Sequence, residues 1–372
     1  MSNSSGSCPD STLGASESRE SEPSEAASLD EQAHVSPRFL GYQTLYWPLA
    51  AFPLEGWGEL LKLFLNCLYH LEDLESMLRR DYLVRTGSCA LAAAMIRPSN
   101  SLAASAANAK NGLGLQLWTV RNQMEADTPA TLKAIADAGY KQIELGRVVG
   151  SEDVVKRAKD LNLEVRSSFF NWQTIAEPSS NVPSVDEVIE KAKEFGLEYL
   201  VFGYIGKSAR DTADKLKAIA DRANEAAEKI VAAGMQMSYH NHSFEFEKMD
   251  GDKTGFDLFV ERFDEKLVNF ELDVFWAAIG GLDPVETLQK LGSRVGQVHL
   301  KDLKKGVGVI YDEGKVPHEA FEEVGDGGLD MQAIMEVAVK NGVTQFHVEQ
   351  DQSPDPIASI GQSAKYAAKN LW

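Results

Sequence analysis

An amphipathic helix that ends in glycine and leads directly into a short apolar strand recurs along this chain from Gly112 onward. The clearest copies are TLKAIADAGYKQIELG, VIEKAKEFGLEYLVFG, ANEAAEKIVAAGMQMSYH and IMEVAVKNGVTQFHVEQ. Gly139, Gly196, Gly234 and Gly342 stand where the end of a helix needs a residue in the left-handed conformation. Regular alternation of helix and strand predicts a parallel sheet.

Eight such strands fit between Gly112 and Trp372, and this number and length match an α/β fold of the (β/α)8 TIM barrel type. We therefore assign residues 107–372 to one barrel domain. The alternative is a doubly wound open sheet, but no glycine-rich phosphate-binding turn follows the first strand. The predicted strands are Leu113–Val120, Gln142–Gly146, Glu164–Phe170, Tyr199–Ile205, Gln236–Phe244, Asn269–Phe275, Gly296–Asp302 and Gln345–Asp351.

The chain ahead of the barrel has a different composition. Residues 1–36 are rich in Ser, Glu and Ala and hold few large apolar side chains, which predicts disorder. Residues 39–76 are more apolar, but their prolines and charges argue against a membrane span. We interpret residues 1–76 as a disordered or spurious extension and Met77 as the true start.

Residues 77–106 have the layout of an export signal. The basic pair Arg79-Arg80 precedes an apolar stretch at 87–96, and the Ala-Ser-Ala sequence at 104–106 supplies a small-residue cleavage site. The arginine pair resembles a twin-arginine signal, which predicts a periplasmic protein with no stable membrane span in its mature part. The alternative is a chance pair of arginines before a short buried helix.

Composition limits the kinds of partner and of metal site. The net charge of −19 argues against a nucleic-acid surface, which needs clustered Lys and Arg. The three cysteines, Cys8, Cys67 and Cys89, all precede the predicted barrel. A metal site in the barrel must therefore use His, Asp, Glu or water.

Polar side chains alternate with apolar ones along the predicted strands, although strands of a parallel sheet are usually apolar on both faces. In MSYHNHSFEF, for example, His240 and His242 should point the same way because a strand alternates its faces. We expect the apolar residues to face the helices and the polar residues to face the barrel axis. Burying so many polar groups is costly unless they bond each other, water or a metal. The polar positions are Gln142, Glu144, Gln236, Ser238, His240, His242, Glu271, Asp273, Gln297, His299, Lys301, Gln345, His347 and Glu349.

Four consecutive strands offer His240, Asp273, His299 and Glu349 at their carboxyl ends, where barrel enzymes build their sites. This mixture of nitrogen and oxygen ligands suits one divalent ion, Mn²⁺, Co²⁺, Zn²⁺, Fe²⁺ or Mg²⁺, without selecting among them. The alternative is a hydrogen-bonded polar layer that holds no metal.

At these residues the chain resembles the xylose isomerase-like barrel superfamily, which includes sugar isomerases, ketose 3-epimerases, inosose dehydratase and endonuclease IV. The resemblance is carried by LGLQLWTVR, YHNHSFEF, ELDVFWAAIGG, VHLKD, EEVGDGGLD and FHVEQDQ, and it covers Gly112–Trp372. VHLKD, GDGGLD and the final VEQD are most similar to the epimerase and dehydratase branch. The resemblance implies a carbohydrate-modifying enzyme and specifies no substrate.

In ketose 3-epimerases one metal is held by Glu, Asp, His and Glu, and the two glutamates also move the proton. The resemblance therefore implies that Asp273, His299 and Glu349 are metal ligands and that His240 replaces the first glutamate. Trp276 replaces a histidine that contacts substrate in those enzymes. Both departures favour a lyase or dehydratase with a single base as the alternative to an isomerase or epimerase.

Further polar residues are candidates for catalysis. We expect Glu349 or His242 to move a proton beside a substrate carbonyl, since histidine titrates near neutral pH. Lys301 either stabilises an oxyanion or binds a hydroxyl, or it pairs with a carboxylate inside the barrel. Glu144 either orients substrate or acts as a second acid/base, or it pairs with Arg121 or Lys301.

Other residues are expected to contact substrate or to support the site. His347, one inward step below Glu349, is expected in a supporting or core position. His318 lies in a loop predicted to cover the site and is expected to be an ordinary loop residue. The candidate substrate-binding residues are Trp118, Phe170, Trp172, Tyr204, Asn241 and Trp276.

The leading functional hypothesis is a divalent-metal-dependent isomerase or epimerase that abstracts a proton next to a carbonyl of a sugar, keto-sugar or cyclitol. The first alternative is a lyase or dehydratase that uses the same site on a keto-sugar or 3-keto-glycoside. An endonuclease IV-like nuclease would need more zinc ligands and a basic groove, and a sugar-binding barrel would not need four convergent ligands. We expect a small carbohydrate as partner and leave a homo-oligomer open.

Overall fold

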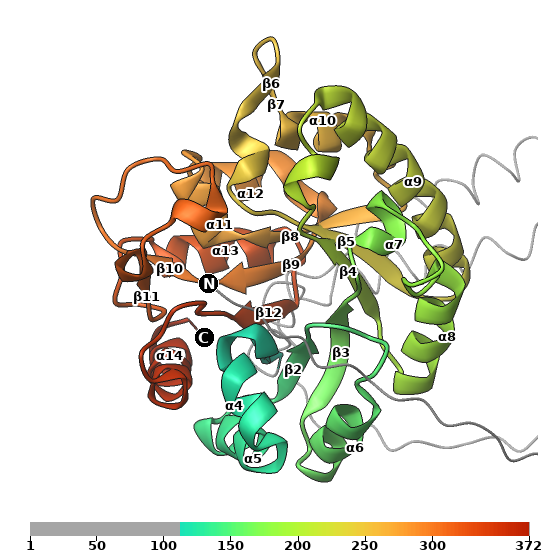
Figure 1. The fold of residues 1–372 in the computed structure, drawn as a ribbon. Helices are drawn as coiled ribbons and strands as arrows, with labels where there is room; N and C mark the ends of the chain where they lie inside the picture. The colour runs from blue at the N-terminus through green and yellow to red at the C-terminus, as the bar shows by residue number, and fades with distance from the viewer. Residues whose placement is uncertain (1–111, 372) are drawn as a thin grey trace, which may run out of the picture. The chain divides into compact units, whose positions relative to one another are not determined.

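Eight parallel strands close into a barrel in the computed structural model, which describes residues 112–371 (Figure 1). The strands follow the order β1-β12-β9-β8-β5-β4-β3-β2, and β1 pairs with both β12 and β2, so the barrel has no open edge. The predicted TIM barrel is confirmed, whereas the predicted extension and export signal lie outside the described residues. The strands are β1 (Leu113–Gln116), β2 (Gln142–Leu145), β3 (Glu164–Phe169), β4 (Tyr199–Gly203), β5 (Gln236–His240), β8 (Val268–Asp273), β9 (Val295–Leu300) and β12 (Gln345–Val348).

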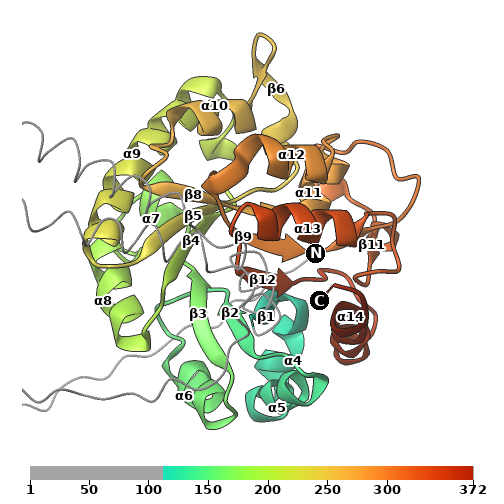
Figure 2. The same ribbon diagram turned by 180° about the vertical axis from the view of Figure 1, so that it is seen from behind.

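Helices surround the barrel in both views (Figures 1 and 2). Gly139 and Gly196 end α5 and α8 in the left-handed conformation, with φ of 102° and 79°, as the sequence predicted. Gly234 and Gly342 have the same conformation two residues beyond the last residues of their helices, Ala232 and Lys340. The helices are α4 (Arg121–Ala126), α5 (Thr128–Ala138), α6 (Glu152–Asp160), α7 (Gln173–Ala176), α8 (Val185–Phe195), α9 (Ala213–Ala232), α10 (Gly255–Arg262), α11 (Val274–Ile279), α12 (Pro284–Leu291), α13 (Met331–Lys340) and α14 (Pro356–Asn370). Among the described residues, no helix combines the length and apolarity needed to cross a membrane.

Every barrel strand ends earlier than the sequence predicted. The reason at β8 is a cap: the Asp273 Oδ1 atom accepts a hydrogen bond from the Trp276 backbone N–H at 2.9 Å, and α11 therefore begins at once. His242, Lys301 and Glu349 consequently lie just beyond their strands, in the loops at the carboxyl end of the barrel.

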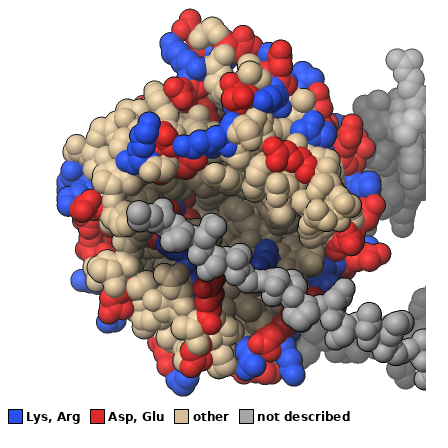
Figure 3. All heavy atoms as spheres, in the orientation of Figure 1, with Lys and Arg blue, Asp and Glu red and all other residues tan. Residues whose placement is uncertain are grey.

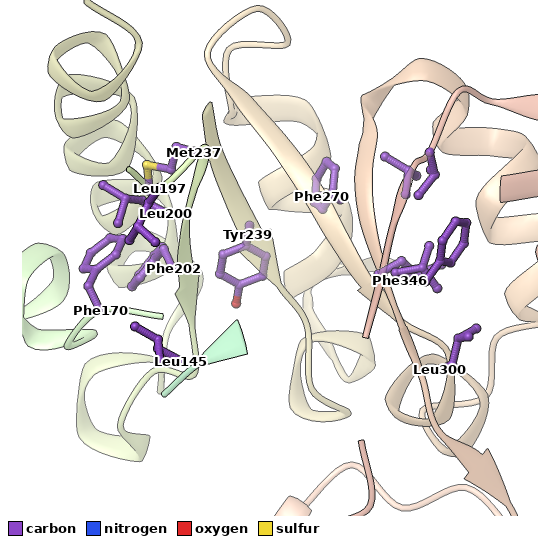
Figure 4. Packing of buried hydrophobic residues seen from close by; sticks show 14 of the residues in the cluster. Leu145, Phe170, Leu197, Leu200, Phe202, Met237, Tyr239, Phe270, Leu300 and Phe346 are labelled. Carbon is purple, nitrogen blue, oxygen red and sulfur yellow. The ribbon is translucent and has the colours of Figure 1, made fainter. Parts of the chain in front are cut away.

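The apolar positions of the strands pack against the helices, as predicted. Tyr239, Phe270 and Phe346 are fully buried in this layer, and Figure 4 shows them with Leu200 and Phe202 around the strands. Burial of each large apolar side chain contributes about 1.5–3 kcal/mol. This layer offsets the cost of the polar residues on the opposite face of the same strands.

Two short antiparallel hairpins were not predicted. β6 (Lys248–Asp250) pairs with β7 (Lys253–Thr254), and β10 (Asp302–Leu303) pairs with β11 (Phe321–Glu322). The second hairpin closes the loop that follows β9, so this long loop has a fixed base beside the carboxyl end of the barrel.

Asp302 explains why the sequence carries both VHLKD and GDGGLD. Its Oδ2 atom accepts hydrogen bonds from the backbone N–H groups of Gly325 and Gly327, and its Oδ1 atom accepts one from Leu329. A Cβ atom at Gly327 would collide with the Asp302 carboxylate, so glycine is required there. The two motifs thus form one structural unit that holds the loop after β11.

Candidate active site and metal centre

A cavity of about 610 Å³ opens among the loops that follow the barrel strands. Figure 3 shows the molecule in the orientation of Figure 1, with a hollow near the centre of this face and charged side chains around its periphery. Most of the residues that the sequence singled out for substrate contact or proton transfer line this cavity. They are Trp118, Phe170, Trp172, Tyr204, His242, Trp276, Lys301 and Glu349. The predicted metal ligand His240 and the loop residue His318 line the cavity as well.

The four predicted metal ligands come together at the cavity floor. One donor atom each of His240, Asp273, His299 and Glu349 lies within 4.8 Å of the others. Asp273 and His299 are fully buried, whereas His240 and Glu349 also reach the cavity wall. The four come from adjacent strands of the barrel, β5, β8, β9 and β12, or from the residue just after them.

Asp273 and His240 each keep a buried ligand atom that has no hydrogen-bond partner among the described residues. Asp273 uses Oδ1 to cap α11, while its buried Oδ2 has no hydrogen-bond partner among the described residues. Oδ2 lies 3.8 Å from His299 Nδ1, and that nitrogen lies 3.1 Å from Glu349 Oε2. Two imidazoles and two carboxylates therefore fit a divalent ion with nitrogen and oxygen ligands.

The Lys301 ammonium places a positive charge beside the candidate metal ligands. Its Nζ atom lies 2.8 Å from Asp351 Oδ1, 3.0 Å from Glu349 Oε2 and 3.6 Å from Asp273 Oδ2, and it also lies 4.8 Å from the centre of the Trp276 ring. Burial opposes the charge, but the three carboxylates raise the pKa of Lys301 above its ordinary value. Lys301 thus pairs with carboxylates, which was the alternative reading of the sequence, and still lines the cavity.

The carboxylates around Lys301 respond differently to burial. Burial favours protonation of Glu349, but Lys301 and His299 hold the pKa of this carboxyl well below its usual range. Burial raises the pKa of Asp351 to about 6, since Lys301 only partly compensates and Glu349 adds repulsion. Glu349 is therefore ionised at neutral pH.

His242 is held by a carboxylate that the sequence did not single out. Both Glu245 oxygens accept hydrogen bonds from the His242 backbone N–H, and Oε1 also accepts one from the Tyr239 hydroxyl at 2.7 Å. Burial raises the pKa of Glu245 to about 7. Burial, with the nearby His240 and Lys301, lowers the pKa of the His242 imidazole well below its ordinary value. His242 is thus a neutral ring that faces the cavity and resists protonation.

Glu144 and Asn241 lie away from the positions that we expected. Glu144 is fully buried below the cavity floor, where it accepts hydrogen bonds from Gln116 Nε2 at 2.7 Å and Ser167 Oγ at 2.6 Å and lies 2.7 Å from His299 Nε2. Among residues 112–371 its ion-pair contacts are to histidines and not to Arg121 or Lys301, and it supports the candidate ligand His299 instead. Asn241 bonds both the N–H and the C=O of the Asp273 backbone, so it fixes the end of β8.

Aromatic side chains form the opposite wall of the cavity, on loops after β1, β3 and β4. The Trp172 and Tyr204 rings meet edge to face with centroids 6.2 Å apart. Tyr204 has a φ of 62°, a conformation that a bulky residue rarely adopts and that is common at functional sites. Trp118 is 52% exposed at the rim, and the Arg121 guanidinium lies 4.6 Å from its ring centre. Flat apolar faces of this kind suit a sugar ring.

Two loops are joined across the mouth of the cavity. Arg210 Nη2 contacts Glu313 Oε1 at 2.5 Å, and Lys207 Nζ contacts Asp312 Oδ1 at 2.7 Å. Arg210 and Glu313 are largely buried, whereas Lys207 is exposed. Sequence reasoning missed this pairing because the partners are more than a hundred positions apart.

Asp351 and Glu271 were also missed as site residues. Asp351 follows Glu349 by two positions, and continued alternation of faces was the signal that would have placed it beside Lys301. Glu271 precedes Asp273 by two positions, and its Oε2 atom lies 3.4 Å from His240 Nδ1. His347 is fully buried below Glu349, as predicted.

Comparison with known proteins agrees with this fold. The xylose isomerase-like TIM barrel family matches residues 132–369 of the chain. An inosose dehydratase from Clostridium beijerinckii is 26% identical over 260 residues, which are 63% of this chain and 84% of that protein. An inosose dehydratase from Clostridium perfringens is 24% identical over 292 residues, which are 70% of this chain and 95% of that protein.

Solved structures show the same architecture. A sugar phosphate isomerase/epimerase from Parabacteroides distasonis superposes with a TM-score of 0.56 at 26% identity and covers 69% of this chain and 94% of its own. A probable 3-DHS dehydratase from Bacillus anthracis superposes with a TM-score of 0.54 at 14% identity, covering 68% of this chain and 98% of its own, and shows the fold alone. From its closed barrel and the family match over residues 132–369, the chain belongs to the xylose isomerase-like TIM barrel family.

Proposed function

We propose that this chain is a divalent-metal-dependent carbohydrate-modifying enzyme that removes a proton next to a carbonyl of a sugar, keto-sugar or cyclitol. The observation that carries this proposal is the convergence of His240, Asp273, His299 and Glu349 at the floor of a cavity that also contains Lys301. A divalent ion on these ligands would supply Lewis acidity, polarising a carbonyl oxygen and stabilising an enediolate.

The protein's own groups perform the proton transfer and charge stabilisation. The Glu349 carboxylate is ionised beside Lys301 and faces the cavity, so it can accept the proton from the carbon next to the carbonyl. The Lys301 ammonium keeps its charge and can stabilise the negative oxygen that develops on the substrate. The aromatic wall of Trp172 and Tyr204 holds the sugar ring and excludes water.

Isomerisation or epimerisation is the first candidate reaction. Glu349 and the neutral His242 reach the cavity from loops after β12 and β5, which are separated by β9 and β8. Glu349, once protonated, can return the proton to the neighbouring carbon, which gives isomerisation. Return on the opposite face needs a proton that reaches the substrate from solvent along the wall that carries His242, which gives epimerisation. The names of the solved sugar phosphate isomerase/epimerase structures support this reading.

Dehydration is the second candidate reaction. The curated relatives named inosose dehydratase favour it, and proton removal by Glu349 is also its first step. Here the carbanion would expel a neighbouring hydroxyl as water, after protonation of that hydroxyl, instead of regaining a proton. A keto-sugar, a 3-keto-glycoside or an inosose would be the substrate.

A substrate screen read by NMR in D₂O tests the proposal. Purified protein with Mn²⁺ or Co²⁺ is incubated with sugars, keto-sugars, inososes and 3-keto-glycosides. Deuterium at carbon in an isomerised product indicates isomerase or epimerase chemistry, whereas an unsaturated or deoxy product indicates dehydration. The Asp273→Asn variant keeps a side-chain oxygen that can cap α11 and should lose both bound metal and turnover. Full turnover in that variant would refute the metal-dependent mechanism.

A further inference from the structure

A second group of side chains meets on the barrel axis, one step below the candidate metal centre. It comprises Glu144, Glu271, His299 and His347, which come from β2, β8, β9 and β12 and are all fully buried. One donor atom of each lies within 4.8 Å of the others. None of the four lines the cavity, so this inner group is closed to substrate.

Three of the four short distances in the inner group are close to the spacing of ligand atoms in a four-coordinate site, and the fourth is a hydrogen-bond distance. His299 Nε2 lies 2.7 Å from Glu144 Oε2 and 3.4 Å from Glu271 Oε1. His347 Nδ1 lies 3.7 Å from Glu144 Oε1 and 3.6 Å from Glu271 Oε1. Ligand atoms at the corners of a tetrahedron around zinc, with bonds of about 2.0–2.1 Å, are about 3.4 Å apart.

Several atoms of the inner group lack the partners that buried polar atoms need. Both Glu271 oxygens and both His347 ring nitrogens are buried and have no hydrogen-bond partner among the described residues. In the part of the chain that the structure describes, the ion-pair contacts of Glu144 and Glu271 are to histidines and not to lysine or arginine. Burial of a carboxylate costs several kcal/mol unless it is paired, and in this group only imidazoles do the pairing.

Neighbouring residues hold the inner group in place. Gln116 and Ser167 donate hydrogen bonds to the two oxygens of Glu144 and so fix its orientation. A Cβ atom at Gly114 would collide with the His347 ring, so glycine on β1 leaves room for the imidazole. The inner group is held by its neighbours, does not open to the cavity and contains ligand atoms without hydrogen-bond partners. These are the properties of a structural metal site.

We propose that Glu144, Glu271, His299 and His347 bind a second divalent cation, with Zn²⁺ favoured by the donor set of two imidazoles and two carboxylates. His299 belongs to both centres, because its Nδ1 atom faces Glu349 and its Nε2 atom faces Glu144. A ring that served both centres would have to lose its N–H protons, because a metal-bound nitrogen carries none, so filling both centres would release protons to solvent. The inner cation neutralises the buried carboxylates and fixes the His299 ring for the outer centre.

Metal counting in matched variants tests this proposal. The full chain is loaded with Zn²⁺ and Mn²⁺, dialysed briefly against a chelator and analysed by inductively coupled plasma mass spectrometry. We expect about two cations per chain in the wild type and about one in Asp273→Asn or in Glu271→Gln. His318→Gln, a histidine on the cavity wall outside both groups, is the control and should retain about two.

Cobalt spectroscopy gives a second readout that does not depend on turnover. Asp273→Asn loaded with Co²⁺ should keep the intense visible bands of a four-coordinate ion, and Glu271→Gln should lose them. His347→Gln replaces Glu271→Gln if circular dichroism shows that the latter is unfolded. A cation that remains bound in Asp273→Asn and is absent from Glu271→Gln supports the inner site, even if no substrate of the screen is converted. A wild type with at most one cation, lost in Asp273→Asn and kept in Glu271→Gln, would overturn it.

Discussion

Lys301 Nζ lies 3.0 Å from Glu349 Oε2, and both side chains reach the cavity although each is almost fully buried. Each group keeps the other charged: the lysine lowers the pKa of the carboxyl, and the carboxylates around the lysine raise its pKa. The pair therefore places an ionised base beside a fixed positive charge. This arrangement suits removal of a proton followed by stabilisation of the resulting oxyanion.

Replacement of Lys301 tests this pairing. Lys301→Met keeps the side-chain length and leaves three carboxylates without their cation, so it should lower the free energy of unfolding of the metal-free protein by about 3 kcal/mol. Added Mn²⁺ supplies positive charge and should recover part of that loss. Urea unfolding with and without Mn²⁺ measures both effects, with the exposed Lys304→Met as control. An equal loss in both conditions would contradict the electrostatic explanation.

Glu245 should make stability depend on pH. Its pKa is about 7 in the folded protein against 4.5 for the free side chain, so the folded state holds the extra proton between these values. The contribution of Glu245 to the free energy of unfolding is then fully present below about pH 4.5. It decreases by about 3 kcal/mol in total as the pH rises from there through 7. Glu245→Gln can still accept the Tyr239 and His242 hydrogen bonds and should remove this component from a pH series of unfolding midpoints. An unchanged pH series in the variant would show that another group is responsible.

Trp118 should affect substrate binding and leave the chemical step nearly intact. Its ring is half exposed at the rim and lies away from the ligands of the candidate metal centre. Trp118→Ala should raise KM by about 5- to 10-fold, corresponding to about 1–1.4 kcal/mol of lost contact, with kcat within about twofold. Steady-state kinetics separate the two parameters. A loss confined to kcat would place Trp118 in the chemical step.

Gly203 should be essential for the position of His240. A Cβ atom at Gly203 would lie 2.7 Å from the Phe169 ring and 2.9 Å from the His240 Cβ atom, so Gly203→Ala must displace the ligand histidine. We expect a loss of metal affinity of at least tenfold, measured by isothermal titration calorimetry, and about 1–3 kcal/mol of stability. Gly146→Ala is the matched control, since Gly146 also lines the cavity and has open space at its Cβ position. Equal effects of the two substitutions would refute the steric argument.

The twin-arginine-type segment around Arg79-Arg80 leads us to propose export to the periplasm. Protein isolated from the periplasm of the producing cell should then begin close to residue 107. Replacement of both arginines by lysine should keep the protein in the cytoplasm, which fractionation and immunoblotting detect. A native N-terminus ahead of residue 77 would refute the proposed start site.

The fold was predictable because its signals are local. Helix periodicity, the glycine after each helix and the strand that follows are all contained within short windows of sequence, and Gly139 and Gly196 adopt the expected conformation. The ends of the strands were not predictable in this way. The bond from Asp273 to the Trp276 backbone ends β8, and no pattern of hydrophobicity reports it. The left-handed Tyr204 likewise carries no glycine-like signal.

The candidate site was partly predictable for the same reason. Alternation of faces at the ends of parallel strands brings together His240, Asp273, His299 and Glu349, as the sequence suggested. The role of Glu144 depends instead on depth along the barrel axis. A register shift between Ile143 and Glu144, where β2 pairs with β3, helps to set this depth. Such a shift depends on how two strands pair, so the sequence of one strand does not reveal it.

The four ligands of the candidate metal centre occupy one half of the barrel, β5, β8, β9 and β12, whereas the aromatic wall comes from loops in the other half. This division makes the barrel modular. The loops after β1, β3 and β4 can be exchanged or diversified in a library without altering the half that carries the metal ligands. New specificities for larger or differently substituted glycosides are therefore best sought in Trp118, Trp172 and Tyr204, with the other half left unchanged.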